Sequence, residues 1–366
     1  MNVLMVGVDN NRLGGMWTVA ETYIKSKEFN AEVNLYYVAT STCGSAIKRL
    51  LKMFQGYVRI FFILMRKNVD IVHVHMAEKG SVYRKGFVVK IAKMFRKKVI
   101  VQMHAGPIMN WYDSITANQQ KKVKKIFNSP DKVLVLGDYW RDQLTRLIPK
   151  EKIDVLYNGA ECSNFNSYNN DGNIILYMGL IKKTKGTFDL VDAIAQINKE
   201  LPSDIRVYIC GADEEGCMAQ YIREKKLEDR IVLPGWISKE QRLELFKNTI
   251  VSVLPSYFEA LSMTVIESMC YGIPVLTTNI TTMPELLGED IELVLPGDIP
   301  QLGKYLLTLI NDRTLRTKIS DIEYRRAKEF FSVEKNIEST LSIYHSILNK
   351  KNKNFHEFDN HIRCVR

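Results

Sequence analysis

Short runs of β-branched and aliphatic residues, each ending near a glycine or a small polar residue, recur along the whole chain. They are NVLMVGV, VDIVHVHM, KVIVQMHA, KVLVLG and IDVLYNG in the first half, and NIILYMG, IRVYICG, RIVLPGW, TIVSVLPS and IPVLTT in the second. Helical patterns such as KGTFDLVDAIAQINKEL and SKEQRLELFKN separate most of these runs. Apolar strands that alternate with helices indicate buried parallel sheets. We therefore predict an α/β fold with two doubly wound sheets.

The boundary between the two sheets is predicted from a polar, Asn-rich segment, NSYNNDGN, at residues 166–173. This segment contains turn-forming residues and almost nothing to bury. A chain of 366 residues with 46% hydrophobic residues can build two separate cores. The predicted parts are an N-terminal domain at 1–168, a C-terminal domain at 169–333, a helix at 334–349 and a polar tail at 350–366.

The cysteine pattern and the N-terminus indicate a cytosolic chain. The six cysteines lack metal-type spacing, and several lie in apolar runs, so we expect reduced, buried thiols. The N-terminus resembles a first strand rather than a signal peptide. The apolar run IFFILM at residues 60–65 is far shorter than the roughly 20 residues that span a bilayer. We expect no transmembrane anchor.

Two carboxylates, Glu259 and Glu267, stand among small and apolar side chains in PSYFEALSMTVIESMCYGIPV, residues 255–275. Glu259 should lie in the loop at the carboxyl end of a strand, where open α/β sheets bind ligands. Glu267 should lie in the helix that follows. The spacing alone does not require a shared ligand. It is explained equally well if Glu267 is a solvated helix residue and Glu259 is an unrelated charge in a loop.

The helix between these carboxylates is predicted to begin after Ser262, which can cap it, and to end near Gly272. The backbone N–H groups of Met263 and Thr264 would open the helix, and a helix N-terminus attracts anions. A ligand with a central phosphate and hydroxyl-rich groups on either side would suit this arrangement.

Two other segments fit a phosphate ligand. Gly14 and Gly15 follow the first strand and precede a helix, as in a loop that lets backbone approach a phosphate, although a tight turn explains them equally well. LIKKTKG delivers Lys182, Lys183 and Lys185 to the carboxyl edge of the second sheet. Ammonium groups there could neutralise a diphosphate, or form a solvated charge run.

Together these residues resemble a GT-B glycosyltransferase of the large retaining family four, which transfers sugars from nucleotide sugars. The resemblance covers nearly the whole chain through six segments, of which the last is the most specific. They are LGG near the start, HAG at 104–106, YNGAECSNF at 157–165, GLIKKTKG at 179–186, LPGW at 233–236 and EALSMTVIESMCYGIPV at 259–275. The resemblance implies two Rossmann-like domains that face a central cleft, with the C-terminal helix packing back toward the N-terminal domain.

The resemblance also implies roles for individual residues. Glu267 would bind the nucleotide ribose, and Glu259 would contact the donor sugar. The amides around Ser262, Met263 and Thr264 would cradle the diphosphate. Lys185 matches the lysine of the family's Lys-Gly motif, and Gly15 matches its N-terminal glycine loop.

The chain departs from the family pattern beside Gly179. The family usually has an arginine at the next position, a second cation for the diphosphate, whereas this chain has Leu180. Either Lys182 or Lys183 replaces this cation, or the donor binds more weakly; we favour a replacement. The family often has glycine where Ala260 and Ser262 stand, which leaves the backbone amides available.

The expected chemistry is sugar transfer with a diphosphate leaving group, stabilised by Lys185, the helix amides and Lys182. No Asp-x-Asp motif or histidine cluster is evident, so we expect no metal requirement and no cofactor beyond the nucleotide sugar. The resemblance implies front-face attack with retention. A double displacement through Glu259, as in retaining glycosidases, stays open.

Three histidines lie in the first half. His104 ends a strand, and the family commonly has a histidine near the donor sugar, so it is a candidate catalytic residue. We expect His73 and His75 to point to opposite faces of their strand, and therefore not to hold one metal together. His73 is interpreted as structural, and His75 either lines the acceptor cleft or is structural.

Charge is divided unequally along the chain. Residues 1–150 contain 25 Lys and Arg against 10 Asp and Glu, while residues 151–366 contain 26 against 31. Apolar residues recur at helical spacing over 47–65, with Lys48, Lys52, Arg59 and Arg66 on another face. Such a helix can lie on an anionic membrane surface, or pack on the sheet with a solvated basic face. We favour the membrane surface at its inner, cytoplasmic face.

The predicted function is transfer of a hexose or N-acetylhexosamine from a nucleotide sugar, UDP before GDP, to a sugar acceptor. Because the resemblance assigns the acceptor to the N-terminal domain, a lipid-diphosphate-linked sugar used in surface polysaccharide synthesis is the preferred acceptor. One alternative is a sugar-nucleotide epimerase of the same fold, and another is a nucleic-acid-binding protein. The basic stretches lack interleaved aromatic residues, which argues against nucleic acid.

Overall fold

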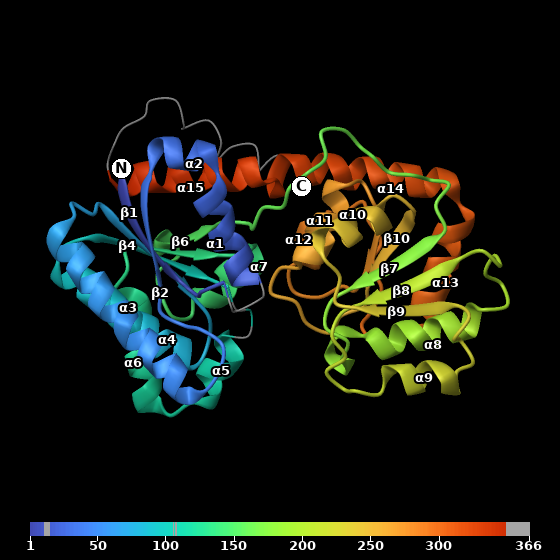
Figure 1. Cartoon of the computed structure of the whole chain (residues 1–366), viewed down its shortest axis with the longest axis horizontal. Coiled ribbons are helices and arrows are strands. Elements are labelled where there is room, and N and C mark those ends of the chain that lie inside the picture. Colours follow the sequence, from blue (N-terminus) through green and yellow to red (C-terminus); the bar gives the residue numbers. More distant parts are fainter. Residues whose placement is uncertain (11–14, 105, 107, 349–366) are drawn as a thin grey trace. The chain divides into compact units, whose positions relative to one another are not determined.

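The chain forms two compact units (Figure 1). The computed structural model describes residues 1–10, 15–104, 106 and 108–348. The first unit contains Met1–Tyr157 and the chain from Glu334 onward, and the second contains Asn158–Val333. The predicted polar tail at 350–366 and Gly14 lie outside the described residues.

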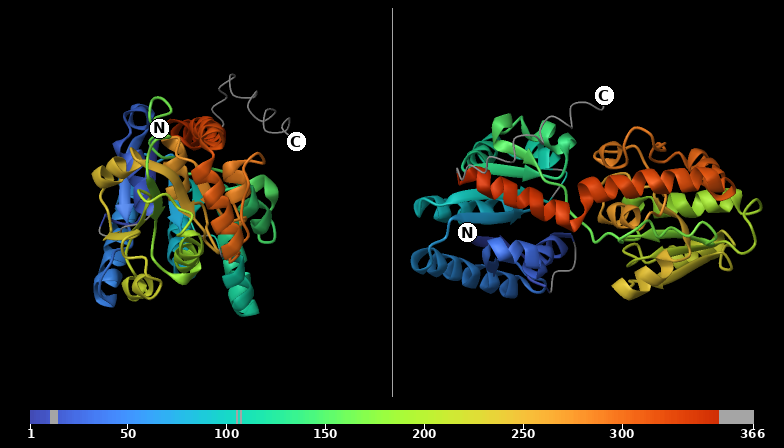
Figure 2. Two further views of the ribbon diagram at one scale, coloured as in Figure 1. Left: turned by 90° about the vertical axis from the view of Figure 1, so that its right-hand side faces the viewer. Right: turned by 90° about the horizontal axis from the view of Figure 1, so that it is seen from above.

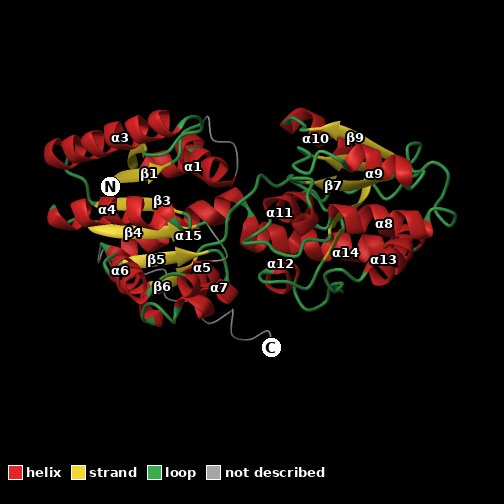
Figure 3. Cartoon of the chain, turned by 90° about the horizontal axis from the view of Figure 1, so that it is seen from below, coloured by secondary structure: helices red, strands yellow, loops and turns green. Residues whose placement is uncertain are grey.

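The first unit contains a parallel sheet with the strand order β2-β1-β3-β4-β5-β6. Figure 3 shows β1, β3, β4, β5 and β6 following one another across it. Its strands are β1 (Asn2–Gly7), β2 (Asn34–Ala39), β3 (Ile71–Met76), β4 (Lys98–Met103), β5 (Lys132–Val135) and β6 (Ile153–Val155). Only β2 was missing from the predicted strands, because this edge strand is mostly half-buried and lacks a continuous apolar run.

Helices cover both faces of this sheet (Figure 2). They are α1 (Gly15–Lys25), α2 (Lys27–Glu32), α3 (Ala46–Arg66), α4 (Gly80–Met94), α5 (Ile108–Ser114), α6 (Ala117–Asn128), α7 (Asp138–Leu144), the 3-10 turn η1 (Lys150–Lys152) and α15 (Val333–Ile347). Tyr23 of α1 and Tyr344 of α15 are fully buried and lie against His73 of β3. The prediction that the C-terminal helix packs on the N-terminal domain is confirmed.

The second unit contains a parallel sheet with the order β11-β10-β7-β8-β9. Its strands are β7 (Ile174–Met178), β8 (Arg206–Cys210), β9 (Ile231–Gly235), β10 (Thr249–Leu254) and β11 (Val275–Thr277). The chain leads from β7 to β8 and β9 on one side, whereas β10 and β11 lie on the other. The strand order therefore reverses between β7 and β10.

Helices also surround this second sheet (Figure 3). They are η2 (Lys183–Lys185), α8 (Thr187–Ile197), α9 (Met218–Glu224), α10 (Lys239–Phe246), α11 (Met263–Cys270), α12 (Met283–Leu287), α13 (Ile299–Asn311), α14 (Arg313–Arg326) and the π-helical turn η3 (Ala327–Phe331). The predicted α/β class with two doubly wound parallel sheets is confirmed.

The structure divides the chain earlier than the predicted boundary between 168 and 169. The segment after Asn158 makes its backbone hydrogen bonds inside the second unit. The N–H of Ala160 donates to the carbonyl of Phe331 at 2.9 Å, and the N–H of Ser163 donates to that of Cys270 at 3.1 Å. Composition could not reveal these pairings, because the partners are distant in the sequence.

Candidate active site

The loops after β7 and β10 bring Lys185 and Glu259 together at the point where the strand order reverses. The Nζ of Lys185 lies 2.5 Å from Oε1 of Glu259. The hydroxyl of Ser256 donates to the same oxygen at 2.8 Å. Glu259 is only 8% exposed, so its charge is held by these two partners rather than by water. Ligands of open α/β sheets bind at such a reversal point.

Backbone geometry holds this pair in place. Gly186 follows Lys185 with φ of +65°, and a Cβ there would lie 1.9 Å from the carbonyl oxygen of Pro255. Only glycine allows such a close approach at this φ. On the other side, the hydroxyl of Thr281 donates to the carbonyl oxygen of Glu259 at 2.7 Å. Both loops are therefore fixed by contacts that substitution would disrupt.

The helix between the two carboxylates begins and ends as predicted. Ser262 caps α11, and its Oγ accepts the N–H of Val265 at 3.4 Å. Met263 and Thr264 are the first residues of α11, whose N–H groups have no acceptor within the helix. Tyr271 is the C-cap, and Gly272 follows with φ of +73°. A helix start of this kind can bind an anion.

Glu267 lies within α11 and pairs with Arg242 of α10 rather than with Glu259. The guanidinium Nη1 donates to Oε2 of Glu267 at 2.7 Å. Burial raises the pKa of Glu267 above its ordinary value, and the nearby Arg242 opposes this shift. Because burial disfavours the carboxylate, Arg242 is the group that favours its ionised form.

Lys182 lies at the same edge of the sheet, where its Nζ is 3.4 Å from Oε2 of Glu214. The backbone N–H of Lys183 donates to Oε1 of Glu215 at 3.5 Å, and the side chain of Lys183 is exposed. Leu180 occupies the position of the family's usual arginine. Both lysines therefore remain within reach of this edge, with Lys182 the more buried.

The structure corrects the expectation that all cysteines are reduced. Cys162 and Cys270 are paired as a disulfide, although 108 positions separate them. Spacing along the sequence could not reveal this pairing. Cys270 ends α11, so the disulfide ties this helix to the segment that contains Glu161. Glu161 in turn pairs with Lys239 at 2.5 Å.

In the first unit, His104 follows β4 and hydrogen-bonds to a second histidine. Its Nε2 lies 2.7 Å from Nδ1 of His75. Burial, with smaller contributions from the charges of His73 and Lys85, lowers the pKa of His104 to about 3. Gly15, the other predicted residue of this unit, begins α1 and is exposed.

The prediction that His73 and His75 point to opposite faces is wrong. Their rings stack with centroids 4.8 Å apart. Successive residues of a strand alternate between faces, so residues two apart share a face. Among the described residues, no group of three or more His, Cys, Asp or Glu could hold a metal ion.

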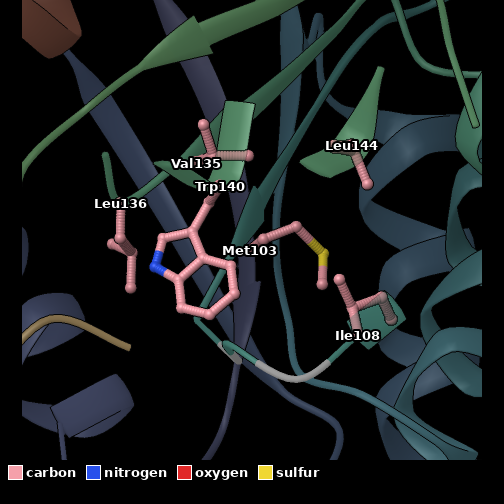
Figure 4. Close-up of a pocket in the computed structure, with 6 residues that line it drawn as sticks. All are labelled: Met103, Ile108, Val135, Leu136, Trp140 and Leu144. Atoms are coloured by element: carbon pink, nitrogen blue, oxygen red, sulfur yellow. The ribbon is translucent and has the colours of Figure 1, made fainter. Parts of the chain in front are cut away.

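A small apolar pocket lies at the carboxyl ends of β4 and β5 (Figure 4). Its lining residues are Met103, Ile108, Val135, Leu136, Trp140 and Leu144. Trp140 is 8% exposed. All six lining residues are buried, so this pocket is part of the core of the first unit.

The sequence did not single out three residues of the second unit that organise its predicted site. Ser256 and Thr281 hold the Glu259 loop, and Arg242 neutralises Glu267. Thr281 is distant in sequence from Glu259, and Arg242 is distant in sequence from Glu267. Only Ser256 had a local signal, since it stands three residues before Glu259 at the end of β10.

Searches against protein families match both halves of the chain. Residues 20–164 match the family described as Glycosyltransferase Family 4, and residues 160–326 match Glycosyl transferases group 1. No described helix is both long enough and apolar enough to cross a membrane.

Individual proteins give the same result. The Escherichia coli K12 protein named lipopolysaccharide 1,6-galactosyltransferase is 26% identical, over 93% of this chain and 99% of its own. The Staphylococcus aureus capsular polysaccharide biosynthesis glycosyltransferase CapH is 24% identical, over 64% of this chain and 67% of its own. The crystal structure of Anabaena HepE in complex with UDP superposes with a TM-score of 0.74 at 15% identity, over 94% of this chain and all of that one.

The fold, the carboxylate-bearing helix and these matches agree, and the two family matches together span most of the chain. The protein is therefore a glycosyltransferase with the GT-B fold, whose N-terminal half matches Glycosyltransferase Family 4 and whose C-terminal half matches Glycosyl transferases group 1.

Proposed function

We propose that this enzyme transfers a hexose or an N-acetylhexosamine from a UDP-sugar to a lipid-diphosphate-linked sugar, with retention, during synthesis of a bacterial surface polysaccharide. The observation that carries the proposal is the Lys185–Glu259 pair, which joins the loop after β7 to the loop that leads into α11 at the strand reversal. A diphosphate between a lysine and a helix start would be neutralised by both.

In the proposed donor complex, the diphosphate binds Lys185 and the N–H groups of Met263 and Thr264. Lys182 supplies the second cation, in the role of the arginine that is absent at Leu180. Lys182 and Lys185 hold carboxylates in the ligand-free structure, so each exchanges part of that contact for phosphate oxygens.

Glu267 binds the ribose hydroxyls. Its Oε2 accepts the hydrogen bond from Arg242, and the other carboxylate oxygen would accept one from the ribose. Arg242 favours the ionised carboxylate that accepts this bond. UDP is the proposed nucleotide because the HepE structure contains it.

Transfer proceeds by front-face attack. An acceptor oxygen forms a bond to the anomeric carbon while the bond to the diphosphate breaks, and the acceptor proton moves to the departing phosphate. Because Oε1 of Glu259 is engaged by Lys185 and Ser256, Glu259 is better placed to orient the sugar and the lysine than to attack. Gly15 would line the site, and His104 contacts the transferred sugar.

The proposed reaction needs no metal ion. The role that a divalent cation has in other transferases, neutralising the leaving diphosphate, would be filled by Lys185, Lys182 and the start of α11. Transfer that survives a chelator at full rate supports this proposal, and loss of activity restored by added Mg²⁺ or Mn²⁺ contradicts it.

The acceptor proposal rests on helix α3. Large apolar side chains along this helix are between 40% and 72% exposed: Ile47, Leu50, Leu51, Phe54, Val58, Phe61, Phe62 and Met65. Lys48, Lys52, Arg59 and Arg66 belong to the same helix, and Arg66 lies 5.2 Å over the ring of Phe62. Exposed apolar residues on a basic helix suit an anionic lipid surface. We propose that the enzyme works at the inner face of the membrane, where a lipid-linked acceptor is available.

Surface polysaccharide synthesis is proposed because the relatives named above act in lipopolysaccharide and capsule synthesis. The family membership does not favour the epimerase or the nucleic-acid-binding alternatives. An epimerase of this fold would need no separate acceptor, and a basic nucleic-acid-binding protein would not need the acidic pair.

A screen of nucleotide sugars tests the proposal. Thermal stabilisation by UDP and one UDP-sugar, with slow UDP release in the absence of an acceptor, is expected. Lys185→Ala should abolish this stabilisation. Conversion of the UDP-sugar to an epimer, or stabilisation by GDP instead of UDP, would overturn the proposed reaction or the proposed donor respectively.

A further inference from the structure

His73 and His75 of β3 and Gln102 of β4 share one buried face of the first sheet, and His104 directly follows β4. His75 pairs in register with Gln102, and the backbone N–H of His104 donates to the carbonyl oxygen of Met76 at 2.9 Å. These contacts place the ring of His104 over the end of β3, where its Nε2 meets Nδ1 of His75 at 2.7 Å. His75 is 1% exposed.

One hydrogen atom is shared between these two ring nitrogens, so the tautomers of the two histidines are linked. Burial lowers the pKa of His75 well below its ordinary value, and the same cause acts on His104. Both rings are therefore neutral, and each carries one proton. Either His75 donates from Nδ1 to Nε2 of His104, or His104 donates from Nε2.

The environment of His75 distinguishes these two arrangements. Its other nitrogen, Nε2, is buried and has no hydrogen-bond partner among the described residues. The amide of neighbouring Gln102 makes no hydrogen bond to it. A proton on Nε2 would be a buried, orphaned donor, which proteins avoid more strictly than an unused acceptor. The proton of His75 therefore belongs on Nδ1.

We propose that His75 is a positioning residue that holds His104 as its Nδ1–H tautomer. The Nε2 of His104 accepts the hydrogen bond from His75, and Nδ1 carries the proton that is available for donation. Under the proposed function, on which this role rests, His104 then donates a hydrogen bond to an oxygen of the transferred sugar. Without His75, a neutral histidine in water prefers the opposite tautomer, with its proton on Nε2.

Nitrogen NMR of the full chain, labelled with 15N-histidine and without substrate, tests the tautomer directly. The chain has six histidines, so single substitutions assign the signals. In the wild type, Nδ1 of His104 should give a protonated signal and Nε2 an unprotonated one. In His75→Leu these should exchange or average. His75→Asn, whose amide N–H lies near the position of Nδ1, should keep the wild-type pattern.

His73→Leu is the matched control, because His73 is equally buried but hydrogen-bonds to Tyr344 at 2.6 Å rather than to His104. It should leave the His104 signals unchanged. A wild-type His104 with its proton on Nε2, or an unchanged pattern in His75→Leu, overturns the proposal. Circular dichroism establishes that each variant is folded.

Kinetics then connects the tautomer with transfer. We expect His75→Leu to lower kcat about tenfold, the loss of one hydrogen bond in the transition state, with little change in the donor KM. His75→Asn should recover most of this loss. A normal kcat in His75→Leu, with the tautomer changed, would remove the catalytic consequence. If the NMR result holds and the protein transfers no sugar, the proposed function fails and the positioning role stands.

Discussion

The two units share a parallel, doubly wound sheet, yet they place opposite kinds of polar group at the carboxyl ends of their strands. In the second unit these are ion pairs, Lys185 with Glu259 and Lys182 with Glu214. In the first unit, the end of β4 carries a neutral imidazole pair, His75 with His104, whose pKa values burial lowers. One sheet edge carries charged side chains that are paired with each other, and the other carries neutral imidazoles.

Under the proposed function, this difference would correspond to the different chemistry of the diphosphate and of the sugar. A diphosphate needs cations that are partly desolvated and already oriented, because the same charge would interact weakly in water. A sugar is neutral and needs directed hydrogen bonds. The first unit holds most of the excess positive charge of the chain, part of it along helices such as α3, and the buried Lys85 is close enough to help lower the pKa values of the imidazole pair.

The largest expected effects concern the ion pairs at the sheet edge of the second unit. Lys185→Ala and Glu259→Ala should each lower kcat by roughly 10²- to 10³-fold, as removal of a leaving-group contact does elsewhere. For Glu259→Ala, the donor KM should change little. Steady-state release of UDP measures both. Glu214→Ala, which breaks the more exposed pair at the same edge, is the control and should cost no more than about threefold.

The next effect concerns the ribose. Glu267→Ala should weaken UDP binding by about 10- to 100-fold with a smaller change in kcat, because it removes a hydrogen bond to a charged group. Calorimetric titration with UDP measures the affinity. Glu224→Ala, an exposed glutamate on α9, should bind UDP like the wild type. Unchanged affinity in Glu267→Ala would show that this carboxylate does not contact the nucleotide.

The third prediction concerns the stability of the first unit at acidic pH, which tests the buried neutral histidines. Burial lowers the pKa of His73 from 6.5 to about 3. Between these two pH values His73 is protonated in the unfolded chain and neutral in the folded chain. Stability is therefore complete above pH 6.5 and falls as the pH drops from 6.5 toward 3. At pH 5 the free energy of unfolding should be lower than at pH 7 by roughly 2 kcal/mol because of His73 alone. Urea unfolding at pH 7 and pH 5 measures it, and His73→Phe should show a shallower pH dependence.

The smallest expected effect concerns membrane contact by the first unit. Leu50 and Phe54 of α3 are 62% and 65% exposed. Replacing both with serine should weaken binding to vesicles that contain phosphatidylglycerol by about tenfold, since two apolar side chains no longer enter the interface. Leu295→Ser changes a similarly exposed residue of the second unit and should have no effect. Equal binding to neutral phosphatidylcholine vesicles would contradict the role of the basic residues.

The sequence predicted the parts of this protein that depend on local patterns. The strands that form continuous apolar runs, the Ser262 cap and the end of α11 near Gly272 all follow from spacing along the chain. The half-buried edge strand β2 lacked such a run. Arg242, Thr281 and the Cys162–Cys270 disulfide could not be predicted, because each depends on contacts between distant segments.

The pair of His75 and His104 shows another limit of prediction from the sequence. His104 was identified from its position at the end of a strand, but its partner His75 was assigned to the wrong face. The stacking of His73 on His75 follows from the alternation within one strand, which the sequence already shows. Only the hydrogen bond from His75 to His104 depends on the register of two neighbouring strands. That register emerges only when the sheet is assembled.

Helix α15 has a consequence for the order in which the protein can fold during synthesis. Tyr344 and Thr340 complete the buried face that His73 and Tyr23 begin, through hydrogen bonds of 2.6 and 3.0 Å. The ribosome makes the first unit's sheet early and this helix only after the second unit. The first unit must therefore wait, with an uncovered apolar face, until the entire second unit has been translated, and a chain that stops early would leave that face open to chaperones or to aggregation.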